Sequence, residues 1–145
     1  MTEYTKRRNK NRGYMKLEVW QKGLELFKLV WKITSRGGID FKLRSQLVDA
    51  AQSVSSNIAE GYGRRSIKEY IQFLYVALGS LAEVLTRCIG LREIGLISPD
   101  DLEQIDTLHY EVENKLLNLV GSLEHKRDSG GWVDAVSENV ADYQT

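Results

Sequence analysis

The segment SIKEYIQFLYVALGSLAEVLTRC, residues 66–88, decides the fold class of this chain. Its apolar residues recur at alternating steps of three and four, a spacing that places them along one side of an α-helix. One stripe consists of Ile67, Ile71, Leu74, Leu78, Leu81, Leu85 and Cys88, and a second of Phe73, Ala77 and Val84. Ser66 stands three residues before Glu69, the spacing of a capping box, so we expect a helix to begin immediately after Ser66.

Three further stretches, at residues 17–33, 43–58 and 102–123, repeat the same helical spacing. Glycines stand between the four stretches and suit left-handed helix ends: Gly37, Gly38, Gly61, Gly63 and Gly95. The run Ser98-Pro99-Asp100-Asp101 combines an N-cap, a proline for the first helical position and carboxylates for the positive helix end. It predicts the start of the last helix.

Four long helices with short links favour an all-α fold, an antiparallel up-down-up-down four-helix bundle. The length of 145 residues fits one domain, and we assign the bundle to residues 15–127. Residues 1–14 hold five cations and one carboxylate and are expected to be a disordered basic arm, whereas residues 128–145 hold four carboxylates without Lys or Arg and are expected to be an acidic, flexible tail. One interpretation is that both ends serve only to keep the protein soluble. The alternative for the basic N-terminal arm is that it binds nucleic acid.

The composition limits the partners and the compartment. Twenty Lys and Arg balance twenty Asp and Glu, so attraction to a polyanion has to come from local patches. The single cysteine, Cys88, cannot form an internal disulfide, which fits a reducing compartment. No apolar run approaches the ~20 residues of a membrane span, and no signal peptide is visible. We therefore expect a cytoplasmic protein that does not contact membranes.

The sequence offers no catalytic or metal-binding constellation. Its two histidines, His109 and His125, do not form the paired Glu-x-x-His motifs of a di-metal bundle, and His109 is expected to be a partly solvated seam residue. Cys88 lies in an apolar stripe and is expected to be a buried structural thiol. Gly61-Tyr62-Gly63 lacks the Gly-Lys-Ser/Thr ending of a phosphate loop. We predict no enzyme activity, no metal and no cofactor.

Cations crowd the predicted corner between the second and third helices. Arg64, Arg65 and Lys68 stand at a helix start, where each opposes the helix dipole by about 0.3–1 kcal/mol. Two compensations are open: pairing to Glu60 and Glu69, or a bound anion such as a nucleic-acid phosphate. The residues expected to shape the corner are Asn57, Glu60, Gly61, Gly63, Ser66 and Glu69. The candidate phosphate-binding residues are Lys6, Arg7, Arg8, Lys10, Arg12, Arg64, Arg65 and Lys68, with Arg44 and Arg87 in addition.

Two of the predicted helices, at residues 17–33 and 67–88, carry two apolar stripes each, more than one bundle seam requires. Tyr62, Tyr70 and Tyr75 are expected to add amphipathic surface. Such a second apolar face usually meets a partner, which predicts a homo-oligomer. The alternative is a monomer whose wide stripes all face its own core.

Several linked motifs occur in order along the chain. They are Leu17-Glu18-Val19-Trp20-Gln21-Lys22, Asn57-Ile58-Ala59-Glu60-Gly61-Tyr62-Gly63-Arg64, Glu69-Tyr70 followed by Phe73-Leu74-Tyr75, and Gly79-Ser80-Leu81-Ala82-Glu83. Over residues 16 to about 125 the chain resembles the four-helix-bundle proteins encoded in intervening sequences of bacterial 23S ribosomal RNA genes, also called the S23 ribosomal protein family. The resemblance implies an antiparallel four-helix bundle that assembles as a homopentameric ring. A related branch, the accessory variability proteins of diversity-generating retroelements, implies a basic pentamer that binds nucleic acid and a reverse transcriptase.

The chain departs from this family pattern in three places. Val48 and Asp49 stand where many members carry two arginines, Ser55 replaces a common proline, and the basic arm precedes Met15. Positive charge is thereby moved from the bundle toward the N-terminus.

These observations together predict a non-enzymatic homo-oligomer, with five subunits as the resemblance implies. It is expected to bind RNA or DNA through the phosphate backbone without sequence specificity, as an accessory to an RNA-processing or reverse-transcriptase complex. The alternative is a protein-interaction scaffold without nucleic-acid contact.

Overall fold

The structure, a computed structural model, describes residues 4–130. A short 3-10 helix precedes four long α-helices: η1 (Lys10–Lys16), α1 (Glu18–Thr34), α2 (Phe41–Gly63), α3 (Ile67–Glu93) and α4 (Pro99–Ser129). No strand occurs between residues 4 and 130, and the prediction of an all-α fold is confirmed. Apart from Asp128, Ser129 and Gly130, the segment predicted as an acidic tail lies outside the described residues.

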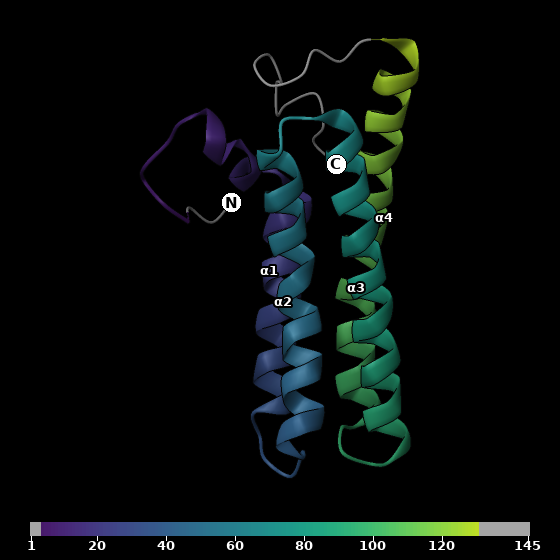
Figure 1. Cartoon of the computed structure of the whole chain (residues 1–145). Helices are drawn as coiled ribbons and strands as arrows, with labels where there is room; N and C mark the ends of the chain where they lie inside the picture. The colour runs from purple at the N-terminus through teal and green to yellow at the C-terminus, as the bar shows by residue number, and fades with distance from the viewer. Residues whose placement is uncertain (1–3, 131–145) are drawn as a thin grey trace.

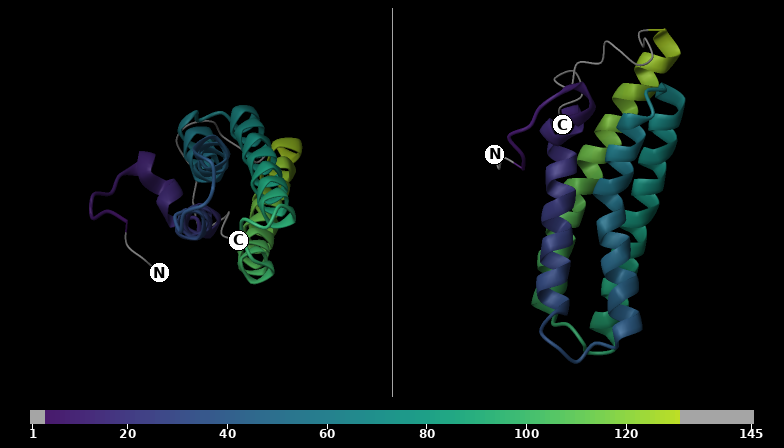
Figure 2. Two further views of the ribbon diagram at one scale, coloured as in Figure 1. Left: turned by 90° about the horizontal axis from the view of Figure 1, so that it is seen from below. Right: turned by 60° about the vertical axis from the view of Figure 1, so that its left-hand side comes forward.

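The four long helices lie side by side (Figures 1 and 2). α2 contacts both α1 and α3, and α4 contacts both α3 and α1. The links at residues 35–40 and 94–98 lie at one end of this helical bundle, and the link at residues 64–66 lies at the other. We call these the loop end and the corner end. η1 packs on α1 and α2 at the corner end.

Polar caps set the helix starts. The Ser98 side chain accepts a hydrogen bond from the Asp101 amide at 3.0 Å, and the Asp101 carboxylate accepts one from the Ser98 amide at 3.0 Å, which completes a capping box with Pro99 in the first turn. The predicted start of the last helix is therefore confirmed. α2 begins earlier than its apolar spacing indicated, because Asp40 caps the amides of Lys42 and Leu43.

Glycines end three of the helices in the left-handed region. Gly37 and Gly38 follow α1 with φ of 97° and 85°, Gly95 follows α3 with φ of 78°, and Gly130 ends α4 with φ of 70°. Only a residue without a Cβ adopts this conformation at no steric cost. The predicted helix ends at Gly37, Gly38 and Gly95 are confirmed.

The core lies between the four helices, and its residues reveal which predicted stripes face inward. On α1 the fully buried side chains include Leu26 and Val30, which belong to the narrower stripe, whereas Trp31 of the longer stripe is half exposed. The fully buried residues of the other helices include Leu47, Ile58, Leu74, Leu81, Ile105, Leu116 and Leu123. The longer stripe of α1 therefore faces outward over part of its length.

α3 is the one helix among the described residues that is long and apolar enough to cross a membrane, with a mean hydropathy of 1.5 over an 18-residue window. The core helix of a soluble protein passes the same test. α3 has α2 on one side and α4 on the other, and its buried face includes Leu74, Leu81 and Cys88. Its apolar composition is accounted for, at least in part, by this packing.

Candidate nucleic-acid interface

The corner between α2 and α3 differs from its prediction in one respect. Gly61 and Gly63 do not separate the helices, because α2 continues through Gly63. The left-handed residue of the corner is Arg65, with φ of 63°. A Cβ on Gly61 would lie 2.8 Å from the Cβ of Phe73 and 3.2 Å from the carbonyl oxygen of Tyr70, so this glycine instead permits α2 and α3 to approach closely.

The corner end holds a cluster of aromatic rings. Tyr62 lies between Tyr14 and Tyr70, with ring centroids 5.9 and 6.0 Å apart, and Tyr14 meets Trp20 at 5.4 Å. The rings meet edge to face, the arrangement that aromatic pairs prefer. Tyr62 and Tyr70 are buried. The prediction that they add exposed amphipathic surface is therefore wrong, and of the three tyrosines named for it only Tyr75 is exposed.

The aromatic cluster and the corner hold η1 in place. The Tyr62 hydroxyl donates to the carbonyl of Lys10 at 3.2 Å, and the Arg65 guanidinium donates to the side-chain oxygen of Asn11. Asn9 caps the helix through the Asn11 amide. Residues 10–14, predicted as part of a disordered arm, instead belong to a 3-10 helix, because Tyr14 gives this polar segment an apolar anchor.

This attachment brings two predicted groups of cations to one end of the bundle. The side chains of Lys6, Arg7, Arg8 and Lys10 are exposed on the arm, and Lys68 is exposed on the first turn of α3. Residues 4–16 hold six cations and no carboxylate. We call the cations of the arm and η1, together with Arg65 and Lys68 at the corner, the basic patch: Lys6, Arg7, Arg8, Lys10, Arg12, Lys16, Arg65 and Lys68.

Two arginines of the arm donate hydrogen bonds to backbone carbonyls. Arg8 and Arg12 each reach the carbonyl of Arg7 at 3.2 Å. A carbonyl oxygen accepts such a bond without neutralising the guanidinium charge. These contacts therefore shape the arm and leave its positive charge in place.

Arg64 stands apart from the basic patch because carboxylates accompany it. Its guanidinium lies 2.9 Å from Glu60 and 3.9 Å from Glu69, and its carbon sits 5.0 Å from the centre of the Phe73 ring. The hydrogen bond to Glu60 is the main cause that raises the pKa of Arg64. The positive charge of Arg64 at this helix start is thus compensated by pairing to carboxylates, one of the two arrangements that the sequence allowed.

The remaining corner residues fix the local geometry. The Asn57 side chain donates to the carbonyl and the hydroxyl of Ser53 at 2.7 and 2.8 Å, and the Ser53 hydroxyl lies 2.8 Å from that of Ser80 on α3. Ser66 caps the Glu69 amide at 3.4 Å. The Glu69 carboxylate lies near Arg64, so Glu69 contributes to the corner mainly through this ion pair.

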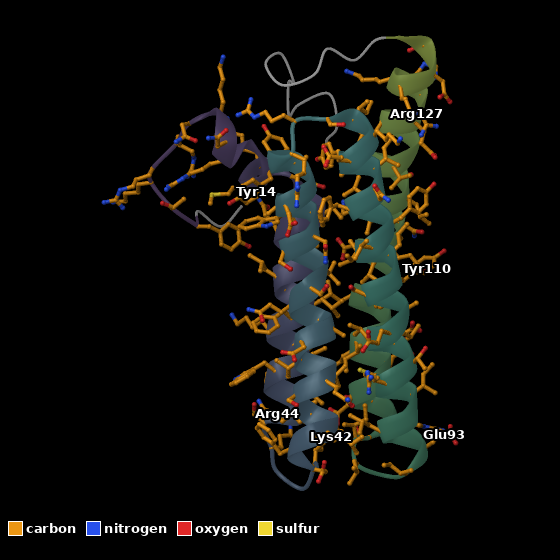
Figure 3. All side chains as sticks on the ribbon, in the orientation of Figure 1. Tyr14, Lys42, Arg44, Glu93, Tyr110 and Arg127 are labelled. Atoms are coloured by element: carbon orange, nitrogen blue, oxygen red, sulfur yellow. The ribbon has the colours of Figure 1, made fainter. Side chains whose placement is uncertain are left out.

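Arg44 and Arg87 lie away from the basic patch. Arg44 is near the loop end, whereas Tyr14 marks the corner end (Figure 3), and its guanidinium stacks 4.2 Å from the centre of the Trp31 ring and donates to Thr34 and Ser35. Arg87 pairs with Glu83 at 2.8 Å and donates to Gln46. Both arginines tie helices together.

The histidine and the cysteine that stand in predicted apolar stripes, His109 and Cys88, are both buried in the core. No group of three or more His, Cys, Asp or Glu side chains within residues 4–130 is placed to hold a metal ion. His109 is buried, not partly solvated as predicted, and its Nε2 lies 2.7 Å from the carbonyl oxygen of Leu81. Burial raises the pKa of the Cys88 thiol to about 12, which keeps it protonated and a poor nucleophile at neutral pH.

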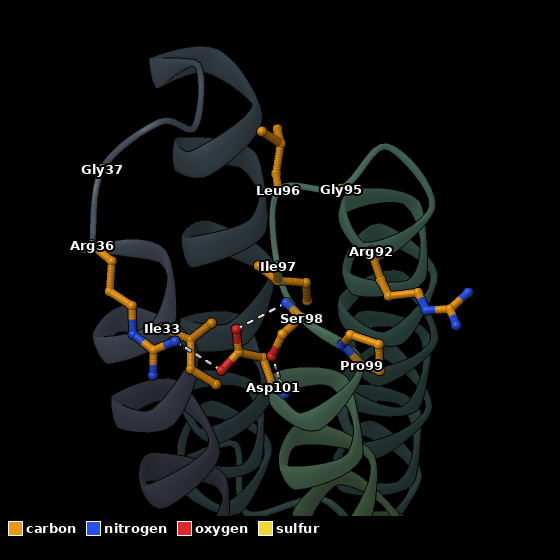
Figure 4. A pocket seen from close by; sticks show the side chains of 10 residues that line it. All are labelled: Ile33, Arg36, Gly37, Arg92, Gly95, Leu96, Ile97, Ser98, Pro99 and Asp101. Atoms are coloured by element: carbon orange, nitrogen blue, oxygen red, sulfur yellow. Dashed lines mark hydrogen bonds and ion pairs between the residues drawn. The ribbon is translucent and has the colours of Figure 1, made fainter.

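The loop end has its own polar contact, between Arg36 and Asp101. A hollow of about 480 Å³ lies there, and on its wall Arg36 reaches Asp101 while Arg92 points away (Figure 4). The contact joins residues 65 positions apart, so no local pattern announces it. The contact between Tyr62 and Lys10 at the corner end likewise joins distant residues that no local sequence pattern connects.

Comparison with known proteins gives a family match. Residues 15–118 match the family model described as 23S rRNA-intervening sequence protein. A search of the curated proteins found no match.

Proposed function

Because the chain belongs to the 23S rRNA-intervening sequence protein family, we propose that it is a non-enzymatic, homo-oligomeric protein that binds RNA or DNA through the phosphate backbone. The observation that carries the proposal is the attachment of η1 to the corner through Tyr62 and Lys10. The attachment holds the cations of the arm at the end of the bundle where Arg65 and Lys68 stand, and together these cations form the basic patch.

The charge of the basic patch suits a polyanion. Its arm has no carboxylate among residues 4–16 to compete with a phosphate. Each phosphate that a Lys or Arg neutralises releases a counterion, and this release drives binding at low salt. The sequence provides no element that reads base edges, so we propose recognition of backbone and shape.

Assembly would multiply these contacts. The proposal takes the subunit as an antiparallel up-down-up-down four-helix bundle and the oligomer as a pentamer in the cytoplasm. Five basic patches on one particle would bind one nucleic acid with an avidity that a single patch lacks. Such a particle would serve as an accessory to an RNA-processing or reverse-transcriptase complex.

The test compares cations of the arm with exposed cations on α1 and α2. The arm variant carries Lys6→Gln, Arg7→Gln and Lys10→Gln, and the control variant carries the same change at Lys28, Lys32 and Lys42, which are also exposed. Fluorescence anisotropy would follow binding of a labelled single-stranded RNA between about 50 and 200 mM salt. We expect the arm variant to reduce the slope of log K against log salt by about 2 and the control to leave it unchanged. A wild-type affinity that does not change with salt, or an equal loss in the control, would contradict the proposal.

The second candidate function is a scaffold for a protein partner, such as a polymerase-like protein. Exposed apolar side chains favour it: Tyr110 is 62% and Leu117 is 49% exposed on α4. The scaffold predicts that a partner stays bound to the immobilised protein after nuclease treatment, and that the arm variant retains it. Loss of the partner on nuclease treatment would contradict the scaffold.

A further inference from the structure

α4 carries the acidic tail, residues 128–145, to the end of the bundle that holds the basic patch. The Tyr75 hydroxyl of α3 donates to Glu124 of α4 at 3.0 Å, so the last turns of α4 lie against the first turns of α3. α4 then continues to Ser129 and ends at the corner end (Figure 1). Lys68 stands on the first turn of α3, and the other neighbour of α4 is α1, which follows η1. The chain after Gly130 therefore starts beside elements that carry the patch.

Residues 131–145 have the charge that complements the basic patch. They follow the described part of the chain and hold Asp134, Glu138 and Asp142 without any Lys or Arg. Carboxylates and phosphates accept the same charge-assisted hydrogen bonds from Lys and Arg. The segment therefore offers the patch the kind of group that a nucleic acid would offer.

The carboxylates described at the corner end pair with cations outside the basic patch. These ion pairs are Glu60 and Glu69 with Arg64, Asp128 with Arg127, and Glu18 with Lys115. Lys126 lies in the last turn of α4 and adds positive charge at this end. An anion beside the start of α3 would compensate the charge of Lys68, which opposes the helix dipole there.

The acidic tail is long enough to reach the patch. An extended chain spans about 3.3 Å per residue, so Asp134 can lie up to about 13 Å and Asp142 up to about 40 Å from Gly130. Neighbouring helices in a bundle are only about 8–10 Å apart. The first carboxylate of the tail can therefore reach the start of α3, and the last can reach the arm across the end of the bundle.

We propose that the acidic tail binds the basic patch of the same subunit and competes there with nucleic acid. The inference rests on the proposed function, because it names the regulation of the same site. The tether gives the tail an effective concentration on the order of millimolar, so even a weak ionic contact occupies the patch for much of the time. A nucleic acid offers more phosphates than the tail offers carboxylates and displaces it. The apparent affinity for nucleic acid is lowered in proportion to the fraction of time for which the patch is open.

The first test neutralises the tail. The neutral-tail variant carries Asp134→Asn, Glu138→Gln and Asp142→Asn. The matched control removes the same charge from exposed positions on α2 and α4, through Asp49→Asn, Glu103→Gln and Asp106→Asn. At about 50 mM salt we expect the neutral-tail variant to bind the labelled RNA roughly three- to tenfold more tightly than the wild type, and the control to bind like the wild type. The gain should shrink toward about 200 mM salt, because charge also holds the tail. Equal affinity of wild type and neutral-tail variant, or an equal gain in the control, would overturn the competition.

The second test detects the contact without RNA. Ser137→Cys introduces a thiol into the tail, and Gly63→Cys introduces one at the corner, where an added Cβ meets nothing within 4 Å. Cys88 is buried and stays out of the reaction. Under mild oxidation the disulfide between the two new thiols should form severalfold faster with the acidic tail than with the neutral tail. Excess RNA should slow its formation with the acidic tail.

The control pair is Ser137→Cys with Gly90→Cys near the loop end, where an added Cβ is equally unobstructed. Its disulfide should form at a rate that does not depend on the charge of the tail. A corner disulfide whose rate is also independent of tail charge, or one that joins two chains, would overturn the contact within one subunit. If the wild type binds no RNA but the corner disulfide depends on tail charge, the proposed function fails and the contact between tail and patch stands.

Discussion

Arg36, in the link after α1, forms an ion pair with Asp101 of α4, with Nη1 of Arg36 2.8 Å from Oδ1 of Asp101 (Figure 4). Arg36 follows α1, and Asp101 belongs to the first turn of α4. The Asp101 side chain is only 9% exposed, and it also accepts a hydrogen bond from the Ser98 amide. One carboxylate thus caps a helix and joins the first helix to the last.

Asp101→Asn is expected to lower the free energy of unfolding by about 1–3 kcal/mol, because it removes a charge-assisted bond from a nearly buried site. The pKa of Asp101 reflects burial, which raises it, and the larger combined effect of bonds from Ser98 and Arg36, which lower it below 3.8. The ionised carboxylate therefore stabilises the fold at pH values above the pKa that Asp101 has in the unfolded chain. This stabilisation is lost as the pH falls through the pKa of Asp101 in the folded protein. Urea titrations from pH 7 to below pH 4 should show a wild-type advantage that shrinks with acid. A constant advantage would argue against a role for the charge.

Gly61→Ala and Gly79→Ala should change stability in opposite directions. The added methyl group at residue 61 would meet the Cβ of Phe73 at 2.8 Å, where α2 and α3 touch, and should cost about 1–3 kcal/mol. At residue 79 nothing lies within 4 Å, so the helix propensity of alanine should contribute about 0.5–1 kcal/mol of added stability. Thermal unfolding of both variants would check this. Equal effects at the two positions would contradict the close approach at Gly61.

The sequence predicted the helices well because periodicity and caps are local signals. Ser98 and Pro99 lie within one turn of the helix that they start. The inward face of α1 was harder to predict, since Phe27 and Trp31 are as apolar as Leu26 and Val30. Which stripe is buried depends on where α2 and α4 lie, and a single helix does not contain that information.

The candidate interface could be predicted only as two separate groups of charges. The arm and the corner are joined by Tyr62 and Lys10, which are 52 residues apart. No spacing rule connects such positions. The same contact explains why Tyr62 is buried, because η1 covers the tyrosine. η1 belongs to a segment whose composition predicts disorder, so the sequence gives no sign of this cover.

Cys88 should make the fold sensitive to alkaline pH. Burial raises the pKa of this thiol from 9.0 to about 12. Between these values the unfolded chain loses a proton that the folded chain keeps, so unfolding becomes easier by about 1.4 kcal/mol per pH unit. Below pH 9 the group has no such effect. Cys88→Ala is the comparison: its stability relative to the wild type should rise from pH 9 to 11 in urea titrations. Parallel pH curves for the two proteins would contradict the buried, neutral thiol.

Tyr14→Ala should release η1 without changing a single charge. The Tyr14 ring meets Trp20 and Tyr62, whereas Tyr14→Phe retains the ring and serves as the matched control. Trypsin should then cleave after Arg12 and Lys16 faster in Tyr14→Ala than in Tyr14→Phe, because local opening exposes the backbone. Binding of the labelled RNA should weaken severalfold in Tyr14→Ala, since the arm is no longer held on the corner, while the salt slope stays that of the wild type because the cations are the same. Equal cleavage of the two variants would show that Tyr14 does not anchor η1. A reduced salt slope in Tyr14→Ala would show that loss of the ring removes phosphate contacts and does not merely leave the cations less well positioned.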